Sequence, residues 1–157
     1  MNPPKNKYFN YVIDTAAQLL PDIPLDFTGY YELIDELKTF EFSDTNRAWE
    51  ISQKCNAWCE YISDIKAVIH QKLADAETDK KVIISLASSK ADDKKVANGD
   101  RLANKDPDVV KIRKYRNFLE ELLQLLEDKH QFLIQSHYFT KMTCDWSLKC
   151  TSSNTNK

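Results

Sequence analysis

Lysine and arginine side chains concentrate in the middle of this 157-residue sequence, where they could bind phosphate groups. The basic stretch, Lys80 to Arg116, contains 11 Lys or Arg and 5 Asp, a local charge of +6. Because the whole chain has a formal net charge of −2, the remainder carries −8. Such asymmetry is typical of a surface that attracts a polyanion. The candidate DNA-binding residues are Lys80, Lys81, Lys90, Lys94, Lys95, Arg101, Lys105, Lys111, Arg113 and Lys114.

Two interpretations of the basic stretch remain open. It could be a solvated charged loop whose lysines are moderated by the interleaved aspartates. Alternatively, it could bind a phosphate backbone by counterion release, without reading bases. Cationic side chains at the start of a helix oppose the helix dipole, and a bound anion would relieve that cost.

The four cysteines could hold a metal ion. Cys55 and Cys59 are one helical turn apart, and Cys144 and Cys150 could complete a tetrahedral set. However, no Cys-x-x-Cys motif is present, and Cys55 and Cys59 flank an apolar stripe. Buried free cysteine is therefore the preferred interpretation. We predict no metal site and no cofactor.

Motifs for catalysis are missing from the sequence. A phosphate-binding loop or a dinucleotide-binding fingerprint needs clustered glycines, and the only two, Gly29 and Gly99, are far apart. No serine or cysteine stands in a nucleophile motif. His130 and His137, two helical turns apart, could line a site but are interpreted as ordinary surface residues. We predict a protein that is not an enzyme and has no catalytic residues, and keep a metal-dependent Cys/His enzyme as an alternative.

Few glycines and long periodic runs predict an all-α fold, since sheets need many tight turns. A first helix is expected at 7–20 and a second at 30–40, separated by Pro21 and Pro24. The second helix should direct Leu33, Ile34 and Leu37 inward. The apolar face predicted for the first helix consists of Tyr8, Tyr11, Val12, Thr15, Ala16 and Leu19.

Two much longer helices should follow. Ser43 or Asp44 is a suitable N-cap for one, and Asp106-Pro107 starts the other. Periodicity is lost from 88 to 105, which predicts a polar, partly ordered connector. The first stripe is Ala48, Ile51, Cys55, Trp58, Ile62, Ile65, Ile69, Leu73 and Ala76. The second is Val110, Tyr115, Phe118, Leu122, Leu126, Leu133 and Tyr138.

These elements predict a long antiparallel helical hairpin braced by the short N-terminal helices. The expected division is 1–42 for the short helices, 43–145 for the hairpin with its basic connector, and 146–157 for a polar tail that frays after Cys150. Antiparallel packing would bring the basic helix ends and the connector to one end of the hairpin. The apolar surface exceeds what one hairpin can cover, which predicts self-association.

No signal peptide and no apolar segment of membrane-spanning length are recognised in the sequence. We therefore expect a cytoplasmic protein with reduced thiols and no membrane partner.

Several short pieces of the chain resemble the UvsY recombination mediator family of T4-like phages. They are an acidic helix and Asp-bearing turn (35–38 and 42–45), then Trp58 followed by Ile65-Lys66, then Lys80-Lys81 before the connector that contains Gly99. The last piece is the entry into the final helix, 103–111, with an aromatic segment at 137–139. The resemblance covers about residues 32–142. The family's aromatic pair before the connector glycine is replaced here by Ala87-Ser88-Ser89.

This resemblance implies a helical protein without nucleotide hydrolysis that assembles into homo-oligomeric rings in the cytoplasm of a phage-infected cell. It implies binding to single-stranded DNA and contacts with a recombinase and a single-strand-binding protein, which such mediators exchange on DNA. The family's DNA-contact position corresponds to Lys81, with Lys80 beside it. The alternative is a non-enzymatic helical interaction or assembly protein of a phage, such as a structural adaptor or an inhibitor of a host enzyme, with no DNA binding.

Overall fold

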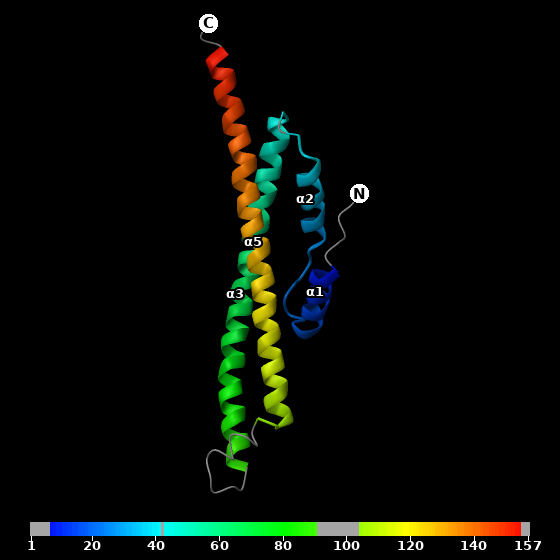
Figure 1. The fold of residues 1–157 in the computed structure, drawn as a ribbon, viewed down its shortest axis with the longest axis vertical. Helices are drawn as coiled ribbons and strands as arrows, with labels where there is room; N and C mark the ends of the chain where they lie inside the picture. Colours follow the sequence, from blue (N-terminus) through cyan, green and yellow to red (C-terminus); the bar gives the residue numbers. More distant parts are fainter. Residues whose placement is uncertain (1–6, 42, 91–103, 155–157) are drawn as a thin grey trace. The chain divides into compact units, whose positions relative to one another are not determined.

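The computed structural model describes residues 7–41, 43–90 and 104–154, and every regular element in them is an α-helix. In chain order these are α1 (Lys7–Leu19), α2 (Thr28–Thr39), α3 (Thr45–Lys90) and α5 (Pro107–Asn154). The two long helices α3 and α5 pack against each other in antiparallel directions, as Figure 1 shows. The predicted all-α fold with a long hairpin and short N-terminal helices is confirmed.

The chain divides into two compact units, to which α3 and α5 both contribute. Unit 1 consists of Met1–Ile65 and Leu126–Lys157, and unit 2 of Lys66–Leu125. Unit 1 therefore contains α1, α2, the first part of α3 and the last part of α5. The described part of unit 2 consists of the remaining parts of the two long helices and residues 104–106.

Side-chain caps begin both long helices. The backbone N–H of Arg47 donates to Oδ1 of Asp44 at 2.9 Å, so Asp44 is the N-cap of α3. Before α5, Oδ1 of Asp106 accepts from the backbone N–H of Asp108 at 2.8 Å, and Pro107 occupies the first helical position. Each cap satisfies an amide that the helix itself leaves without a partner.

The predicted apolar stripe of α3 is confirmed. Trp58 and Leu73 are half-buried, and the remaining members are fully buried: Ala48, Ile51, Cys55, Ile62, Ile65, Ile69 and Ala76. The stripe continues through both units, which explains why one uninterrupted helix forms.

The apolar stripe predicted for α5 is correct in the middle and wrong at both ends. Leu122, Leu126 and Leu133 are buried, but Val110 is 38% exposed and Tyr138 64% exposed. Val109 and Leu119 occupy the buried positions near the start instead. A helix with 3.6 residues per turn offers two neighbouring rows there, and packing against α3 selects the row one residue away.

The face predicted for α1 is correct at Val12 and Ala16 and wrong at three other positions. Tyr8, Tyr11 and Leu19 are exposed, whereas the buried residues are Phe9, Val12, Ile13 and Ala16. The rings of Phe9 and Phe27 pack edge to face with centroids 5.3 Å apart, so an all-carbon ring takes the position that was predicted for a tyrosine. In α2, Leu33 is buried, and Ile34 and Leu37 are half-buried.

An aromatic cluster holds α2 and the preceding loop on α3 in unit 1. Phe27 stacks on Trp58 with ring centroids 5.8 Å apart. The hydroxyl of Tyr61 donates to the carbonyl of Pro24 at 2.5 Å and accepts from the N–H of Asp26 at 3.1 Å. A Cβ at Gly29 would lie 3.2 Å from the Trp58 ring, so this close approach favours glycine.

Both long helices extend beyond their predicted ends. Helix α3 continues to Lys90, and α5 continues to Asn154, through most of the segment predicted as a polar tail. Residues 91–103, the centre of the predicted connector, lie outside the described residues.

The corrected register of α5 can be tested with two adjacent valines. Val109→Ala removes buried methyl groups and should lower the free energy of unfolding by about 1.5 kcal/mol. Val110→Ala should change it by less than about 0.5 kcal/mol, because exposed substitutions are mild and alanine favours helix. Urea denaturation followed by circular dichroism measures both. Equal losses at the two positions would contradict this register.

Candidate nucleic-acid interface

The basic residues come from two helix segments that pack side by side in unit 2. Lys80 and Lys81 lie in the last part of α3, and Lys111, Arg113 and Lys114 lie in the first turns of α5. Because the segments are antiparallel, the end of α3 and the start of α5 meet at one end of the hairpin (Figure 1). We call the described cations of this region the basic end: Lys80, Lys81, Lys105, Lys111, Arg113, Lys114 and Arg116.

Two cations of the basic end form ion pairs with the single carboxylate of Glu77. Its carboxylate lies 3.1 Å from Nζ of Lys80 and forms an ion pair with the guanidinium of Arg116. Nη2 of Arg116 also lies 2.6 Å from Oε1 of Glu120. The side chains of Lys80 and Arg116 are each only 26% exposed. This network joins α3 to α5 and occupies the charge of Lys80, a predicted DNA-binding residue.

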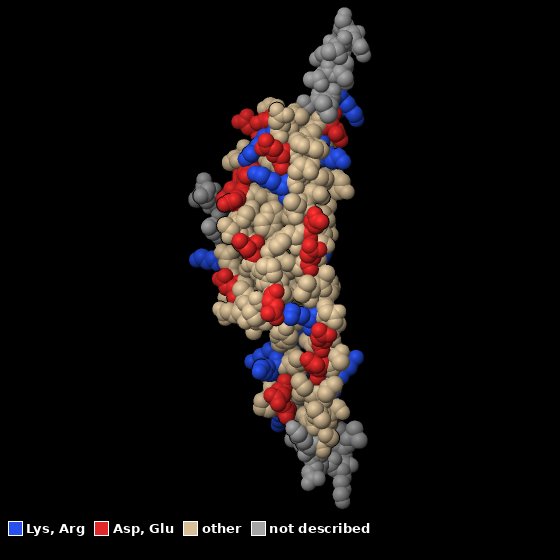
Figure 2. All heavy atoms as spheres, turned by 180° about the vertical axis from the view of Figure 1, so that it is seen from behind, with Lys and Arg blue, Asp and Glu red and all other residues tan. Residues whose placement is uncertain are grey.

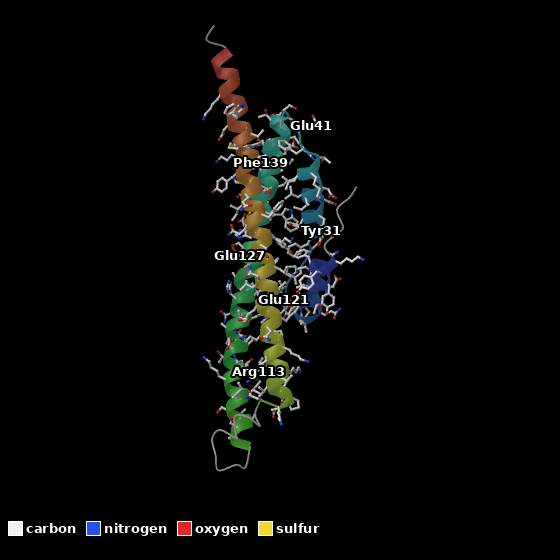
Figure 3. The ribbon with its side chains drawn as sticks, viewed as in Figure 1. Tyr31, Glu41, Arg113, Glu121, Glu127 and Phe139 are labelled. Carbon is white, nitrogen blue, oxygen red and sulfur yellow. The ribbon has the colours of Figure 1, made fainter. Side chains whose placement is uncertain are left out.

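Arg113, which Figure 3 labels on α5, also has a partner, since its guanidinium donates to the side-chain oxygen of Asn104 just before α5. By contrast, four lysines of the basic end are exposed and form no ion pair with any residue described in the structure. These are Lys81, Lys105, Lys111 and Lys114. They are the side chains that an external phosphate could reach without displacing an internal partner.

The remaining predicted site residues are Lys90, Lys94, Lys95 and Arg101. Lys90 is the last residue of α3. Lys94, Lys95 and Arg101 lie outside the described residues.

Formal charge differs in sign between the two units. Unit 2 contains 13 Lys or Arg and 10 Asp or Glu, a balance of +3, whereas unit 1 contains 9 and 14, a balance of −5. On the face in Figure 2, acidic and basic side chains are nevertheless interspersed. On this face, the basic side chains therefore do not form a continuous positive surface.

Aromatic side chains of unit 2 offer little for stacking on bases. Its sequence contains only Tyr115 and Phe118, and both are half-buried. Burial and the charge of Asp75 raise the pKa of Tyr115, so its hydroxyl stays protonated at neutral pH. Contacts at the basic end would thus be made to phosphates rather than to base rings.

Cys55, Cys59, Cys144 and His137 belong to the packed part of unit 1, and the side chain of Cys150 lies outside the described residues. Burial raises the pKa of Cys55 to about 12 and also raises that of Cys59. Sγ of Cys144 donates to the carbonyl of Thr45 at 3.5 Å. Nδ1 of His137 lies 3.0 Å from both the Oγ and the carbonyl oxygen of Ser52. Thiols that remain protonated at neutral pH are poor metal ligands and nucleophiles, in agreement with the interpretation as buried free cysteine.

Glu77 is the residue that sequence reasoning missed. It lies three positions before the basic stretch and was therefore not counted with it. The spacing of Glu77 and Lys80, three residues apart on a helix, was the available signal for an ion pair. Its second contact, with Arg116, depends on how α3 packs on α5.

Comparisons with protein families, with characterised proteins and with solved structures found no match to this chain. Among the helices described, none is long and apolar enough to cross a membrane.

Replacement of Glu77 tests whether its ion pairs stabilise the fold. Glu77→Gln should lower the free energy of unfolding by about 1 kcal/mol at low salt, because Lys80 and Arg116 lose their common partner. The loss should shrink as salt rises. Glu121→Gln is the matched control, since Glu121 is exposed and has no ion-pair partner among the described residues. Equal effects of the two substitutions in urea denaturation would contradict the role of Glu77.

Proposed function

We propose that this chain binds single-stranded DNA without sequence preference and helps a recombinase to replace a single-strand-binding protein on that DNA. The observation that supports DNA binding is the meeting of the end of α3 with the start of α5. The exposed Lys81, Lys111 and Lys114 thereby occupy one end of the hairpin, although the whole chain is acidic. The mediator role rests on the resemblance described above.

Binding would proceed through phosphates. Exposed lysines release counterions when they neutralise a backbone, which makes affinity strongly dependent on salt. No base-reading groups are needed, and no reaction is catalysed. Lys80 and Arg116 would contribute only if a phosphate displaced Glu77, so they are expected to add less than the exposed lysines.

The pieces of the resemblance have different roles in the structure. Trp58 belongs to the aromatic cluster of unit 1 and stacks on Phe27. Lys80 and Lys81, in contrast, lie in the basic end of unit 2. We therefore assign DNA contacts to Lys80 and Lys81, of which Lys81 is the exposed residue.

DNA binding is tested by Lys81→Ala/Lys114→Ala. Each lysine that neutralises a phosphate contributes about 0.7 to the slope of log affinity against log salt, so the slope should fall by about 1.4. Anisotropy of a labelled oligo(dT) at several salt concentrations gives this slope.

The matched control is Lys7→Ala/Lys141→Ala, which removes the same charge from exposed positions of unit 1. It should leave the slope unchanged. Affinity that is absent or independent of salt in the wild type, or an equal loss in the control, would refute the proposed DNA interface.

A second candidate function is a helical assembly protein without DNA binding, and the exposed apolar residues of α5 favour it. Phe132, Phe139 and Trp146 follow one another at intervals of seven residues and are 43%, 44% and 72% exposed. Met142, also exposed, fills the intermediate position of the same heptad pattern. Heptad spacing of apolar residues is typical of a helix that pairs with another helix.

Light scattering after size exclusion distinguishes these functions. Under the mediator proposal, the wild type should have the mass of several copies, and Trp146→Glu should reduce it because a charge enters the contact. Tyr11→Glu, at a position 66% exposed on α1, should leave the mass unchanged. A monomeric wild type that also lacks DNA affinity would favour an assembly protein that acts on a different partner.

A further inference from the structure

A cavity of about 440 Å³ lies between α1 and α2 in unit 1. Its polar lining includes the carboxylates of Asp14, Asp26, Glu32 and Asp35, and its walls include the rings of Phe27 and Tyr31. No Lys, Arg or His is among the described residues that line it. The volume is within the range of small-molecule sites.

The carboxylates give this cavity a negative potential that the described residues only partly compensate. Asp35 lies 2.8 Å from Nζ of Lys38. Oδ1 of Asp26 accepts from the N–H of Thr28 at 2.9 Å, and this hydrogen bonding lowers the pKa of Asp26. Asp14 and Glu32 are exposed and have no ion-pair partner in the described part of the chain.

The same negative potential affects the pKa of the Tyr31 phenol. Burial and the charge of Asp14 raise its pKa, and its hydroxyl donates to the side-chain oxygen of Asn10, which also lines the cavity. Figure 3 shows Tyr31 on α2. The hydrogen bond with Asn10 holds the Tyr31 ring in the wall of the cavity.

The aromatic walls add attraction for a cation. Phe27 is only 4% exposed, and Phe9, another lining residue, packs edge to face on it. Nζ of Lys129 lies 5.2 Å from the centroid of the Phe9 ring, although Lys129 does not line the cavity. The cluster thus already accommodates one ammonium group by a cation–π contact.

A metal ion does not fit this arrangement. Among the described residues, no three His, Cys, Asp or Glu side chains lie close enough together to hold one. Separated carboxylates between aromatic rings instead suit a longer ligand. Such a ligand would carry ammonium groups at its ends and methylene groups that contact the rings.

We propose that the cavity between α1 and α2 binds an aliphatic diamine or polyamine, with its ammonium groups at Asp14 and Glu32 and its methylene groups along Tyr31. This site is independent of the proposed DNA interface, because every residue that it uses belongs to unit 1.

Calorimetric titration of the full chain with putrescine, without DNA, tests the proposal. Putrescine should bind at one site per chain, and Asp14→Asn/Glu32→Gln should weaken binding about 10-fold, since two charge-assisted contacts are lost. Asp22→Asn/Glu60→Gln removes equal charge from exposed positions that do not line the cavity. This control should change affinity less than about 2-fold, as expected for long-range screening alone.

Nitrogen-15 NMR of the wild type provides a second measurement that does not depend on the folding of a variant. Putrescine should shift the side-chain amide of Asn10 and the backbone amide of Thr28, and leave Ser52 in the core of unit 1 unchanged. Absence of these shifts, or equal weakening by both double substitutions, would overturn the site. Binding of a trilysine peptide or of Mg²⁺ at these residues, with no binding of putrescine, would also overturn it.

Discussion

The pairing of apolar stripes between α3 and α5 is the interaction on which the rest of the structure depends. The two helices are 46 and 48 residues long, and isolated helices gain little stability in water without a packed face. Burial of Ile69, Ala76, Leu119 and Leu122 in unit 2 therefore holds both helices in place. Their antiparallel direction also places the end of α3 beside the start of α5, and this creates the basic end.

The apolar faces of α3 and α5 are covered differently in the two units. In unit 1, α1 and α2 cover a second face of α3 with the aromatic cluster around Trp58 and Phe27. Among the described residues of unit 2, the only helices are parts of α3 and α5, which pack on each other, and Val82 and Leu86 remain 53% and 54% exposed. The stability of two helices that share a single apolar contact surface depends more on polar contacts at the edges of that surface. The ion pairs of Glu77 with Lys80 and Arg116 are such contacts, so the proposed phosphate binding would compete with stability for these two cations.

Periodicity alone predicted the helices, the stripe of α3 and both helix starts, because these are local properties of the chain. Eight successive steps of three and four residues leave one choice of face, and Asp44 or Asp106-Pro107 cap a helix wherever it packs. The shifted faces of α1 and of the start of α5 were not predictable in this way. Adjacent rows there are similarly apolar, and only tertiary partners select Phe9 over Tyr8 or Val109 over Val110. The contact of Glu77 with Arg116 and the cavity between α1 and α2 likewise bring together residues that are distant in sequence.

The two units carry net charges of opposite sign, and the basic end belongs to the positive unit. Residues 7–41 contain seven Asp or Glu and two Lys or Arg, so the α1–α2 segment accounts for a balance of −5. Repulsion by this segment would keep a polyanion away from α1 and α2, and attraction at Lys81, Lys111 and Lys114 would confine it to unit 2. The same acidic segment attracts cations to the cavity that it lines. The proposed anion binding at the hairpin end and the proposed cation binding at the short helices thus follow local charge, which the net charge of −2 conceals.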